Sequence, residues 1–145
     1  MNMLIEEFTQ DRHNLQEIND LLSMAMGNPT SVNLRRLMDE FYTSDGHAIF
    51  VATNDNKVVC VIGMDYTDKP LGVITQITVL PENRKQGVGN YLINHVTAVL
   101  ELTNIEAETD QDAVDFYNAC GFKTKEIVSR YQGVRRFRCL KSIIK

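Results

Sequence analysis

The segment VITQITVLPENRKQGVGNYLINHV, residues 73–96, constrains the fold more than any other part of this chain of 145 residues. Its first part is rich in β-branched residues, which predicts a strand over residues 71–80. Its last part places apolar side chains at helical spacing, which predicts a helix from about residue 86 to residue 102. The stretch RKQGVG joins the two, with Gly87 and Gly89 one residue apart. The sequence therefore predicts a strand, a glycine-containing loop and a helix in succession.

The loop before this predicted helix is suited to an anion. The first backbone N–H groups of a helix lack intrahelical partners, and the helix macrodipole is positive there. Glycine has no Cβ, so a phosphate oxygen can approach the backbone closely. Arg84 and Lys85 add positive charge beside the loop. Two linked phosphates would suit such a turn, although a tight turn flanked by solvated basic residues is an equally open interpretation.

Two other phosphate-binding loops do not match. A Walker A loop requires G-x-x-x-x-G-K-[ST], which the sequence lacks. The dinucleotide fingerprint requires a third glycine three residues after Gly89, where this chain has Leu92.

The rest of the chain predicts short strands and helices in the order βααβββαβαββ. The other predicted strands cover residues 3–9, 48–53, 58–66, 105–110, 125–131 and 134–143, and the other predicted helices cover residues 14–26, 31–42 and 113–120. No repeat, low-complexity tract or linker divides the sequence. We therefore expect a single domain over residues 1–145.

The composition narrows the class of protein. A net charge of −4 argues against general nucleic-acid binding, which usually leaves a basic footprint. No apolar run is long enough to cross a bilayer, and no signal peptide is evident, so we expect a cytoplasmic protein without a membrane partner. Cys60, Cys120 and Cys139 are far apart and predict reduced, mostly buried thiols. The three histidines have no ligand spacing, so no metal site is expected.

A second informative segment, TDQDAVDFYNACGF, covers residues 109–122. Its apolar residues fall at helical spacing, and Asp110 is placed to cap the helix. Taken alone, Tyr117 is best interpreted as a half-buried aromatic residue whose hydroxyl finds a partner.

Together the two segments resemble the GNAT superfamily of acetyl-CoA-dependent N-acetyltransferases. The family carries an Arg/Gln-x-x-Gly-x-Gly/Ala loop between a strand and a long helix, and the matching residues here are Arg84, Lys85, Gln86, Gly87, Val88 and Gly89. The family also tends to carry Asn-x-x-Ala-x-x-Phe-Tyr-x-x-x-Gly-Phe near its end, and this chain matches at Ala113, Phe116, Tyr117, Gly121 and Phe122. The order of predicted elements agrees as well, so the resemblance covers nearly the whole chain.

The resemblance implies an α/β (α+β) fold: a single GNAT-like domain with a mixed, mostly antiparallel sheet of about seven strands and helices on both faces. The fourth and fifth strands would splay apart to admit acetyl-CoA as cosubstrate. A bulge near Ile74 would be consistent with this, because Val73, Thr75, Ile77 and Val79 keep one parity and Ile74 breaks the alternation.

The resemblance also implies roles for particular residues. Backbone groups of Ile77, Thr78 and Val79 would pair with the pantetheine arm, and the main chain from Lys85 to Val88 or Gly89 would hold the pyrophosphate. The full predicted acetyl-CoA-binding set is Ile77, Thr78, Val79, Arg84, Lys85, Gln86, Gly87, Val88, Gly89, Asp110, Ala113 and Phe116. Tyr117 takes the position of the general acid, since a phenol with a pKa of about 10 can protonate the leaving thiolate at neutral pH.

The general base is not identified by the resemblance. Some members place a glutamate on the fourth strand, where this chain has Thr75 beside Gln76. His47 titrates in a suitable range but could equally be a surface residue at a strand start. Asp65 and Asp68 could face the acceptor or be solvated turn residues. The amine could also arrive partly neutral and lose its proton to water.

The leading function is transfer of an acetyl group from acetyl-CoA to a primary amine of a small molecule or peptide, by direct attack. Asp110, where many members carry Asn, and the missing strand-four acid keep a non-catalytic CoA-binding regulatory module open. An acyltransferase using another acyl-CoA, for instance succinyl-CoA, is a third possibility. The RRFRC run near the end is either a solvated edge or a surface for an anionic acceptor or partner. A homodimer is plausible from family habit.

Overall fold

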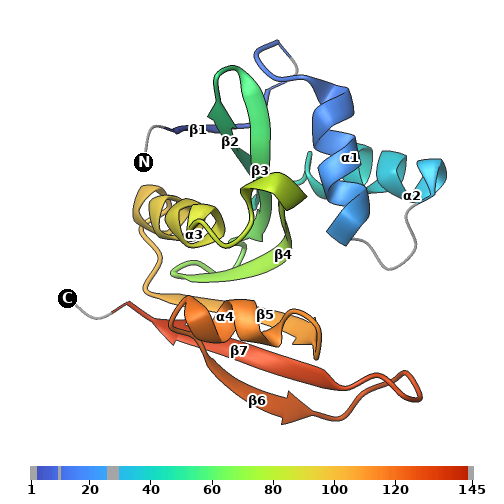
Figure 1. The fold of residues 1–145 in the computed structure, drawn as a ribbon, viewed down its shortest axis with the longest axis vertical. Helices are drawn as coiled ribbons and strands as arrows, with labels where there is room; N and C mark the ends of the chain where they lie inside the picture. Colours follow the sequence, from blue (N-terminus) through green and yellow to red (C-terminus); the bar gives the residue numbers. More distant parts are fainter. Residues whose placement is uncertain (1–2, 10, 26–29, 144–145) are drawn as a thin grey trace.

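The computed structural model describes residues 3–9, 11–25 and 30–143, and its elements follow the predicted order (Figure 1). They are β1 (Leu4–Glu7), α1 (Leu15–Ala25), α2 (Ser31–Arg36), a π-helical segment (Leu37–Phe41), β2 (His47–Asn54), β3 (Lys57–Asp65), β4 (Leu71–Val79), a 3-10 turn (Pro81–Asn83), α3 (Val88–Val99), β5 (Asn104–Asp110), α4 (Val114–Ala119), β6 (Lys123–Ile127) and β7 (Arg136–Ser142).

The strands form one sheet of seven, in the order β1-β2-β3-β4-β5-β7-β6. Every neighbouring pair is antiparallel except β4 and β5, which run parallel. The long connection through α3 makes this possible, because parallel strands need a crossover rather than a tight turn. The predicted mixed, mostly antiparallel sheet is confirmed.

Helices cover both faces of the sheet, as the sequence predicted (Figure 1). On one face, α1 packs on β2 and β3 through a cluster of buried residues: Ile18, Leu21, Leu22, Ile49, Val51, Val58 and Val61. On the other face, α3 and α4 pack on the sheet through a second cluster that includes Phe50, Ile62, Leu92, Ile93, Val96, Ile105, Tyr117 and Phe122. Each fully buried Leu, Ile or Val contributes about 1.5–3 kcal/mol, so these clusters fix the helices on the sheet.

The parallel pairing of β4 with β5 is short. It joins Leu71, Gly72 and Val73 to Asn104, Ile105 and Glu106, in that order. Beyond these residues β4 continues to Val79 and β5 to Asp110 without pairing to each other. The two strands therefore part along most of their length, which confirms the predicted splay.

A β-bulge lies on β4 where the strands part. Gly63 pairs with Gln76, but its neighbour Met64 pairs with Ile74, so Thr75 is the extra residue. A bulge bends its strand and increases the local twist. It also lets two consecutive side chains, those of Thr75 and Gln76, turn toward the α1 face of the sheet, where both reach Tyr42.

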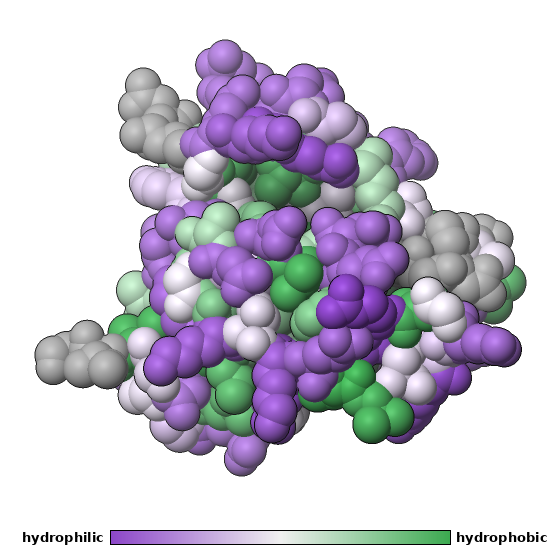
Figure 2. Space-filling model, turned by 60° about the horizontal axis from the view of Figure 1, so that its bottom comes forward, coloured by the Kyte–Doolittle hydropathy of each residue, from purple (hydrophilic) through white to green (hydrophobic). Residues whose placement is uncertain are grey.

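Two elements differ from the sequence prediction. The helix expected over 31–42 changes from α to π geometry at Leu37. The strand expected over 125–131 covers Lys123–Ile127 instead, because its pairing with β7 ends at Arg136. Val128, which completes an apolar pattern, is 95% exposed and lies in the connecting loop. Figure 2 shows such hydrophobic residues at separate points on a mainly hydrophilic face.

Gly89 lets α3 and α4 approach each other closely. It is buried in the first turn of α3, and a Cβ there would lie 2.7 Å from two ring atoms of Phe116 on α4. Atoms at that separation cannot coexist without movement of the ring or of the helix. The packing of the two helices thus requires glycine at this position.

We predict that Gly89→Ala lowers the free energy of unfolding by about 1–3 kcal/mol through overpacking against Phe116, despite the better helix propensity of alanine. Urea denaturation measures the change. Asn94→Ala, on the exposed side of the same helix, is the matched control and should be neutral or stabilising. A Gly89→Ala protein as stable as the wild type would contradict the close approach of the two helices.

Candidate active site

The parting of β4 and β5 opens a cleft of about 620 Å³. One wall is the β4 segment from Ile74 to Val79, and the opposite wall is the end of β5 from Glu108 to Asp110. Phe116 and Tyr117 of α4 close one side. Arg84 and Arg136 also line the cleft, as do Met24 and Ala25 at the end of α1. The splayed strands therefore surround a space open to a ligand.

The β4 wall offers backbone hydrogen-bonding groups. From Ile74 onward, the groups that point toward β5 have no strand partner. Ile77 and Val79 pack against the α3 face of the core. Thr78 points the other way, is 6% exposed, and its hydroxyl has no partner in the described residues. Unsatisfied polar groups in a cleft wall favour a ligand that can pair with them.

The loop before α3 presents free amides. Gly87 occupies the N-cap position with a φ of 79°, and no side chain caps the helix. Lys85 also has a positive φ, 62°, which a non-glycine residue rarely adopts. The Nε of Arg84 donates to the Val79 carbonyl at 3.0 Å, which anchors this side chain beside the cleft. The N–H groups that begin α3 are thus left for an anion.

Gly89 has a different place from Gly87. It lies inside α3, in helical conformation, and its missing side chain makes room for Phe116. Val88 beside it is buried in the core. The side chain of Gln86 donates through Nε2 to the backbone carbonyl of Glu82 at 3.4 Å. The two glycines of the motif are therefore needed for different reasons: Gly87 for its positive φ, and Gly89 for the close approach of Phe116.

Tyr117 lies at the base of the cleft on α4. The residue is 5% exposed, and the rings of Phe116 and Phe122 contact it edge-on at centroid distances of 5.1 and 5.2 Å. Its hydroxyl has no hydrogen-bond partner within the described part of the chain. Burial raises the pKa of Tyr117 well above that of a free phenol, with smaller contributions from Cys139 and Cys120. Tyr117 is thus a protonated donor at neutral pH.

Asp110 ends β5 and holds the turn that leads into α4. Its Oδ1 accepts from the backbone N–H of Asp112 at 2.9 Å and from that of Ala113 at 3.1 Å. The α4 helix itself begins at Val114, with Ala113 in the N-cap position. Asp110 therefore positions α4, and through it Tyr117, by fixing the preceding turn.

On the α1 side of the bulge, Tyr42, which no sequence pattern singled out, lines a second cavity and contacts two residues of the cleft wall, Thr75 and Gln76. The Tyr42 hydroxyl donates to Gln76 Oε1 and shares a hydrogen bond of 2.8 Å with Thr75 Oγ1. It occupies the space that a side chain at position 63 would need, since a Cβ on Gly63 would overlap it. A glycine inside a buried strand, which often marks close approach of another group, was the available signal.

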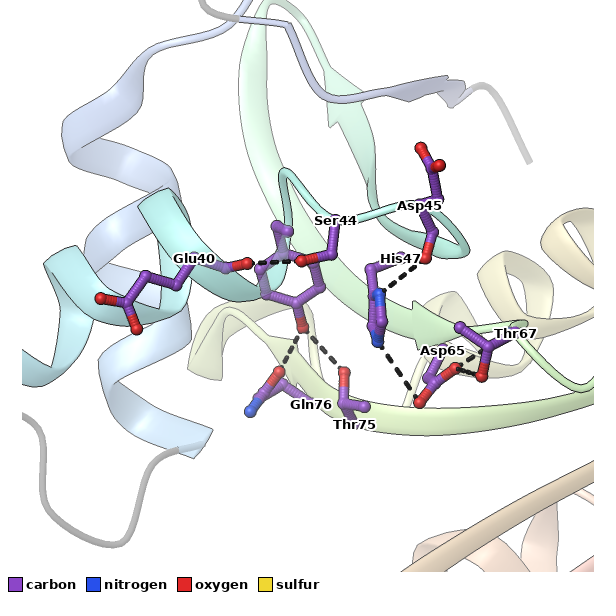
Figure 3. Close-up of polar contacts among 9 residues, drawn as sticks. Glu40, Ser44, Asp45, His47, Asp65, Thr67, Thr75 and Gln76 are labelled. Carbon is purple, nitrogen blue, oxygen red and sulfur yellow. Dashed lines mark hydrogen bonds and ion pairs between the residues drawn. The ribbon is translucent and has the colours of Figure 1, made fainter.

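His47, a candidate base, and Asp65, which was expected to face the acceptor or the solvent, pair with each other (Figure 3). The His47 Nε2 lies 3.4 Å from Asp65 Oδ2, and its Nδ1 lies 3.1 Å from the Asp45 carbonyl. Burial opposes ionisation of Asp65, but hydrogen bonds from Thr67 and the nearby imidazole outweigh it and lower its pKa. His47 lines a second cavity of about 720 Å³ under α1 and α2, rather than the cleft.

The comparisons with known proteins establish the family. Residues 45–124 match a family model described as an acetyltransferase (GNAT) domain. This match covers more than half of the chain, which therefore belongs to the GNAT acetyltransferase family, whose donor is acetyl-CoA.

Solved structures share the fold over the full length. An aminoglycoside 6'-N-acetyltransferase complexed with coenzyme A has a TM-score of 0.78 at 16% identity, covering 98% of both chains. The ribosomal-protein-S18-alanine N-acetyltransferase of Escherichia coli has a TM-score of 0.72 at 16% identity, covering 97% of this chain and 94% of that one. A GNAT acetyltransferase of Elizabethkingia anophelis with acetyl-CoA bound has a TM-score of 0.71 at 17% identity, covering 98% and 99%.

At these identities the likeness shows the fold alone. No curated protein sequence matches the chain at a significant level. In the part of the chain that the structure describes, no helix is both long and apolar enough to cross a membrane. The same residues contain no group of three or more His, Cys, Asp or Glu arranged to hold a metal ion.

The burial of the Tyr42 hydroxyl predicts how the stability of the protein depends on alkaline pH. Burial raises its pKa to about 12, although the hydrogen bond with Thr75 lowers it somewhat. An unfolded phenol has a pKa of about 10, so between these values the unfolded chain loses a proton that the folded chain keeps. Stability is therefore lost as pH rises through this window, and Tyr42→Phe should make the loss shallower by up to about 1.4 kcal/mol per pH unit.

Urea denaturation at several pH values between about 10 and 12 gives the slope of the free energy of unfolding against pH, for the wild type and for Tyr42→Phe. The matched control is Tyr131→Phe, because Tyr131 is 66% exposed and should leave the slope unchanged. Equal slopes for Tyr42→Phe and the wild type would show that Tyr42 ionises like an exposed phenol.

Proposed function

We propose that this protein transfers an acetyl group from acetyl-CoA to a primary amine of a small molecule or peptide by direct attack, with Tyr117 as general acid. The observation that carries the proposal is the joining of three features in one cleft. These are the unpaired edge of β4, the Tyr117 hydroxyl, and Arg84 of the loop that leads into α3. Each corresponds to a different part of the donor.

Two of these features, the free β4 edge and the loop with Arg84, fit the pantetheine arm and the diphosphate of acetyl-CoA. The diphosphate would lie against the amides of residues 85–89, where Gly87 leaves the start of α3 uncapped and Arg84 supplies charge. The pantetheine arm would extend along Ile77, Thr78 and Val79 and pair with the free β4 edge, as an added strand does. Phe116 and Ala113, both half-buried in the cleft wall, would flank this arm.

Tyr117 would complete the reaction. The amine nitrogen bonds to the thioester carbonyl carbon, the carbon–sulfur bond breaks, and the thiolate takes the Tyr117 proton. The attacking nitrogen, which must lose a proton to become an amide, then restores the phenol. A backbone N–H of β4 would polarise the thioester carbonyl, and the cleft would supply positioning. A phenol is protonated at neutral pH, and burial raises the pKa of Tyr117 further, so the proton is in place on its oxygen.

The acceptor is an amine of a small molecule or a peptide. Two enzymes of the same fold are named for their acceptors, one for an aminoglycoside and the other for the alanine of ribosomal protein S18. The fold is therefore compatible with either class. A cytoplasmic location and a homodimer stay predictions of the sequence analysis.

We predict that Tyr117→Phe lowers kcat by at least about tenfold, because the thiolate leaves without its proton donor. Acetyl-CoA affinity should stay within about twofold, since the ring still fills its place between Phe116 and Phe122. Tyr66→Phe is the control, because Tyr66 packs at the edge of the core and does not line the cleft. Assays of thiol release measure kcat, and calorimetric titration measures the affinity for acetyl-CoA. Unchanged turnover in Tyr117→Phe would remove Tyr117 from the mechanism.

The same assay separates the alternative functions. A library of amino acids, polyamines, aminoglycosides and peptides with free N-termini is screened with acetyl-CoA and with succinyl-CoA. Turnover with acetyl-CoA and at least one amine is the expected result. Tight acetyl-CoA binding with no turnover would support a regulatory module, whereas faster turnover with succinyl-CoA would support another acyl donor.

A further inference from the structure

We propose that Glu108 is the carboxylate that removes the proton from the acceptor ammonium group. The inference rests on the proposed function and adds the proton acceptor that the family resemblance left unassigned. Four observations carry it: the position of Glu108 along β5, the face it occupies, its lack of partners, and the absence of a free base on β4.

Glu108 lies directly across the opening from the bulge. The last pair in the parallel ladder joins Val73 to Glu106. Two residues further along each strand are Thr75 on β4 and Glu108 on β5, at the level where the strands part. Both residues line the cleft, together with Tyr117. Glu108 is therefore placed beside the point at which an amine would meet the thioester.

Glu108 and Tyr117 come from opposite faces of the sheet. Ile105, Ala107 and Thr109 are buried on the face that carries α3 and α4, so the alternating Glu108 turns to the other face. Tyr117 belongs to the core on the α3 and α4 face. An amine arriving beside Glu108 would thus attack from one side, while the sulfur leaves toward the phenol on the other.

Glu108 differs from its two acidic neighbours on the same face of β5. Glu106 forms an ion pair with Arg138, and Asp110 accepts two backbone N–H groups before α4. Arg138 lies opposite Glu108 in the ladder between β5 and β7, but its side chain pairs with Glu106. Glu108 therefore has no ion pair or hydrogen bond within the described residues. Its carboxylate is exposed and makes no ion pair within the described residues, so it can receive the ammonium group of the acceptor.

The β4 side of the opening supplies no alternative base. The Thr75 and Gln76 side chains are already bonded to Tyr42, and neither accepts a proton at neutral pH. Burial raises the pKa of Tyr42 to about 12, so its phenolate is scarce. The His47 ring faces Asp65 and lies outside the cleft.

The charges around Glu108 come from β5, β7 and the neighbouring turns. Arg138 is directed to Glu106, and Arg136 pairs across the ladder with Asp110 at the cleft wall. Lys125 of β6 lies opposite Arg138 on the far side of β7. Arg84 also lines the cleft and Asp112 follows in the turn after β5. The part of α1 in the cleft, Met24 and Ala25, is uncharged.

The proton balance is simple. Glu108 takes one proton from the ammonium nitrogen and later releases it to water, so the free amine can attack. The nitrogen loses its second proton to the Tyr117 oxygen, which has given its own proton to the coenzyme A sulfur. The net products are an amide, coenzyme A thiol and one proton.

The experiment compares Glu108→Gln with the wild type, using the amine that the library screen shows to be turned over fastest. At neutral pH we expect kcat/KM for the amine to fall by roughly a hundredfold. Without the carboxylate only the neutral amine reacts, so the deficit should shrink by about tenfold per pH unit as the pH approaches the pKa of the amine. Acetyl-CoA affinity should not change.

Asp112→Asn is the matched control, because it removes one unpartnered carboxylate from the same cleft and should retain most activity. Glu108→Asp keeps the carboxylate and should restore part of the activity and the wild-type pH profile. A Glu108→Gln protein with wild-type kcat/KM, or with the same deficit at every pH, would overturn the assignment. A larger loss in Asp112→Asn would also overturn it. If the wild type itself binds acetyl-CoA but acetylates no amine, the proposed function fails instead.

Discussion

The early end of the parallel pairing between β4 and β5 determines the rest of the site. Only three residue pairs hold these strands together before they part. The bulge at Thr75 bends β4 at that point, so the free edge from Ile74 to Val79 faces a cleft instead of a neighbouring strand. A buried backbone group without a partner costs about 1–3 kcal/mol, which favours an extended ligand that can replace the missing strand. The β4 edge is therefore open to a ligand because the sheet is interrupted there.

The two faces of the sheet contribute different chemistry to this opening. The α3 and α4 face brings the uncapped helix start at Gly87 and the protonated Tyr117, both suited to a thioester donor with a diphosphate. The opposite face brings the Tyr42 hydrogen bonds that hold Thr75 and Gln76. The π-helical segment before Tyr42 aims its hydroxyl at the bulge, an irregularity often found at functional sites.

Local patterns in the sequence predicted the order of elements, and the family resemblance predicted the mixed sheet and the parting of β4 and β5; the structure confirms both. The loop at Gly87 lies at the start of α3, as its short motif predicted, whereas its contact with a diphosphate stays a prediction. The Tyr42 cluster joins residues more than thirty positions apart, so the sequence could indicate a close approach at Gly63 but not which side chain makes it. The first strand of the last hairpin was expected to continue to Tyr131 because the apolar Val128 resembles a strand residue, but the strand ends at Ile127 and Val128 is 95% exposed. Gly89 was interpreted as a phosphate contact or as part of a tight turn, since the close approach of Phe116 to it is a tertiary effect.

The most direct test compares the affinity of coenzyme A with that of pantetheine, which lacks the diphosphate and the phosphorylated adenosine attached to it. By calorimetric titration, the wild type should bind coenzyme A at least about a hundredfold more tightly, a difference of about 2.7 kcal/mol. In Gly87→Val, whose φ of 79° a β-branched residue cannot adopt without strain, most of this difference should disappear while pantetheine affinity is retained. An unchanged ratio in a folded Gly87→Val protein would contradict the placement of the diphosphate at the start of α3.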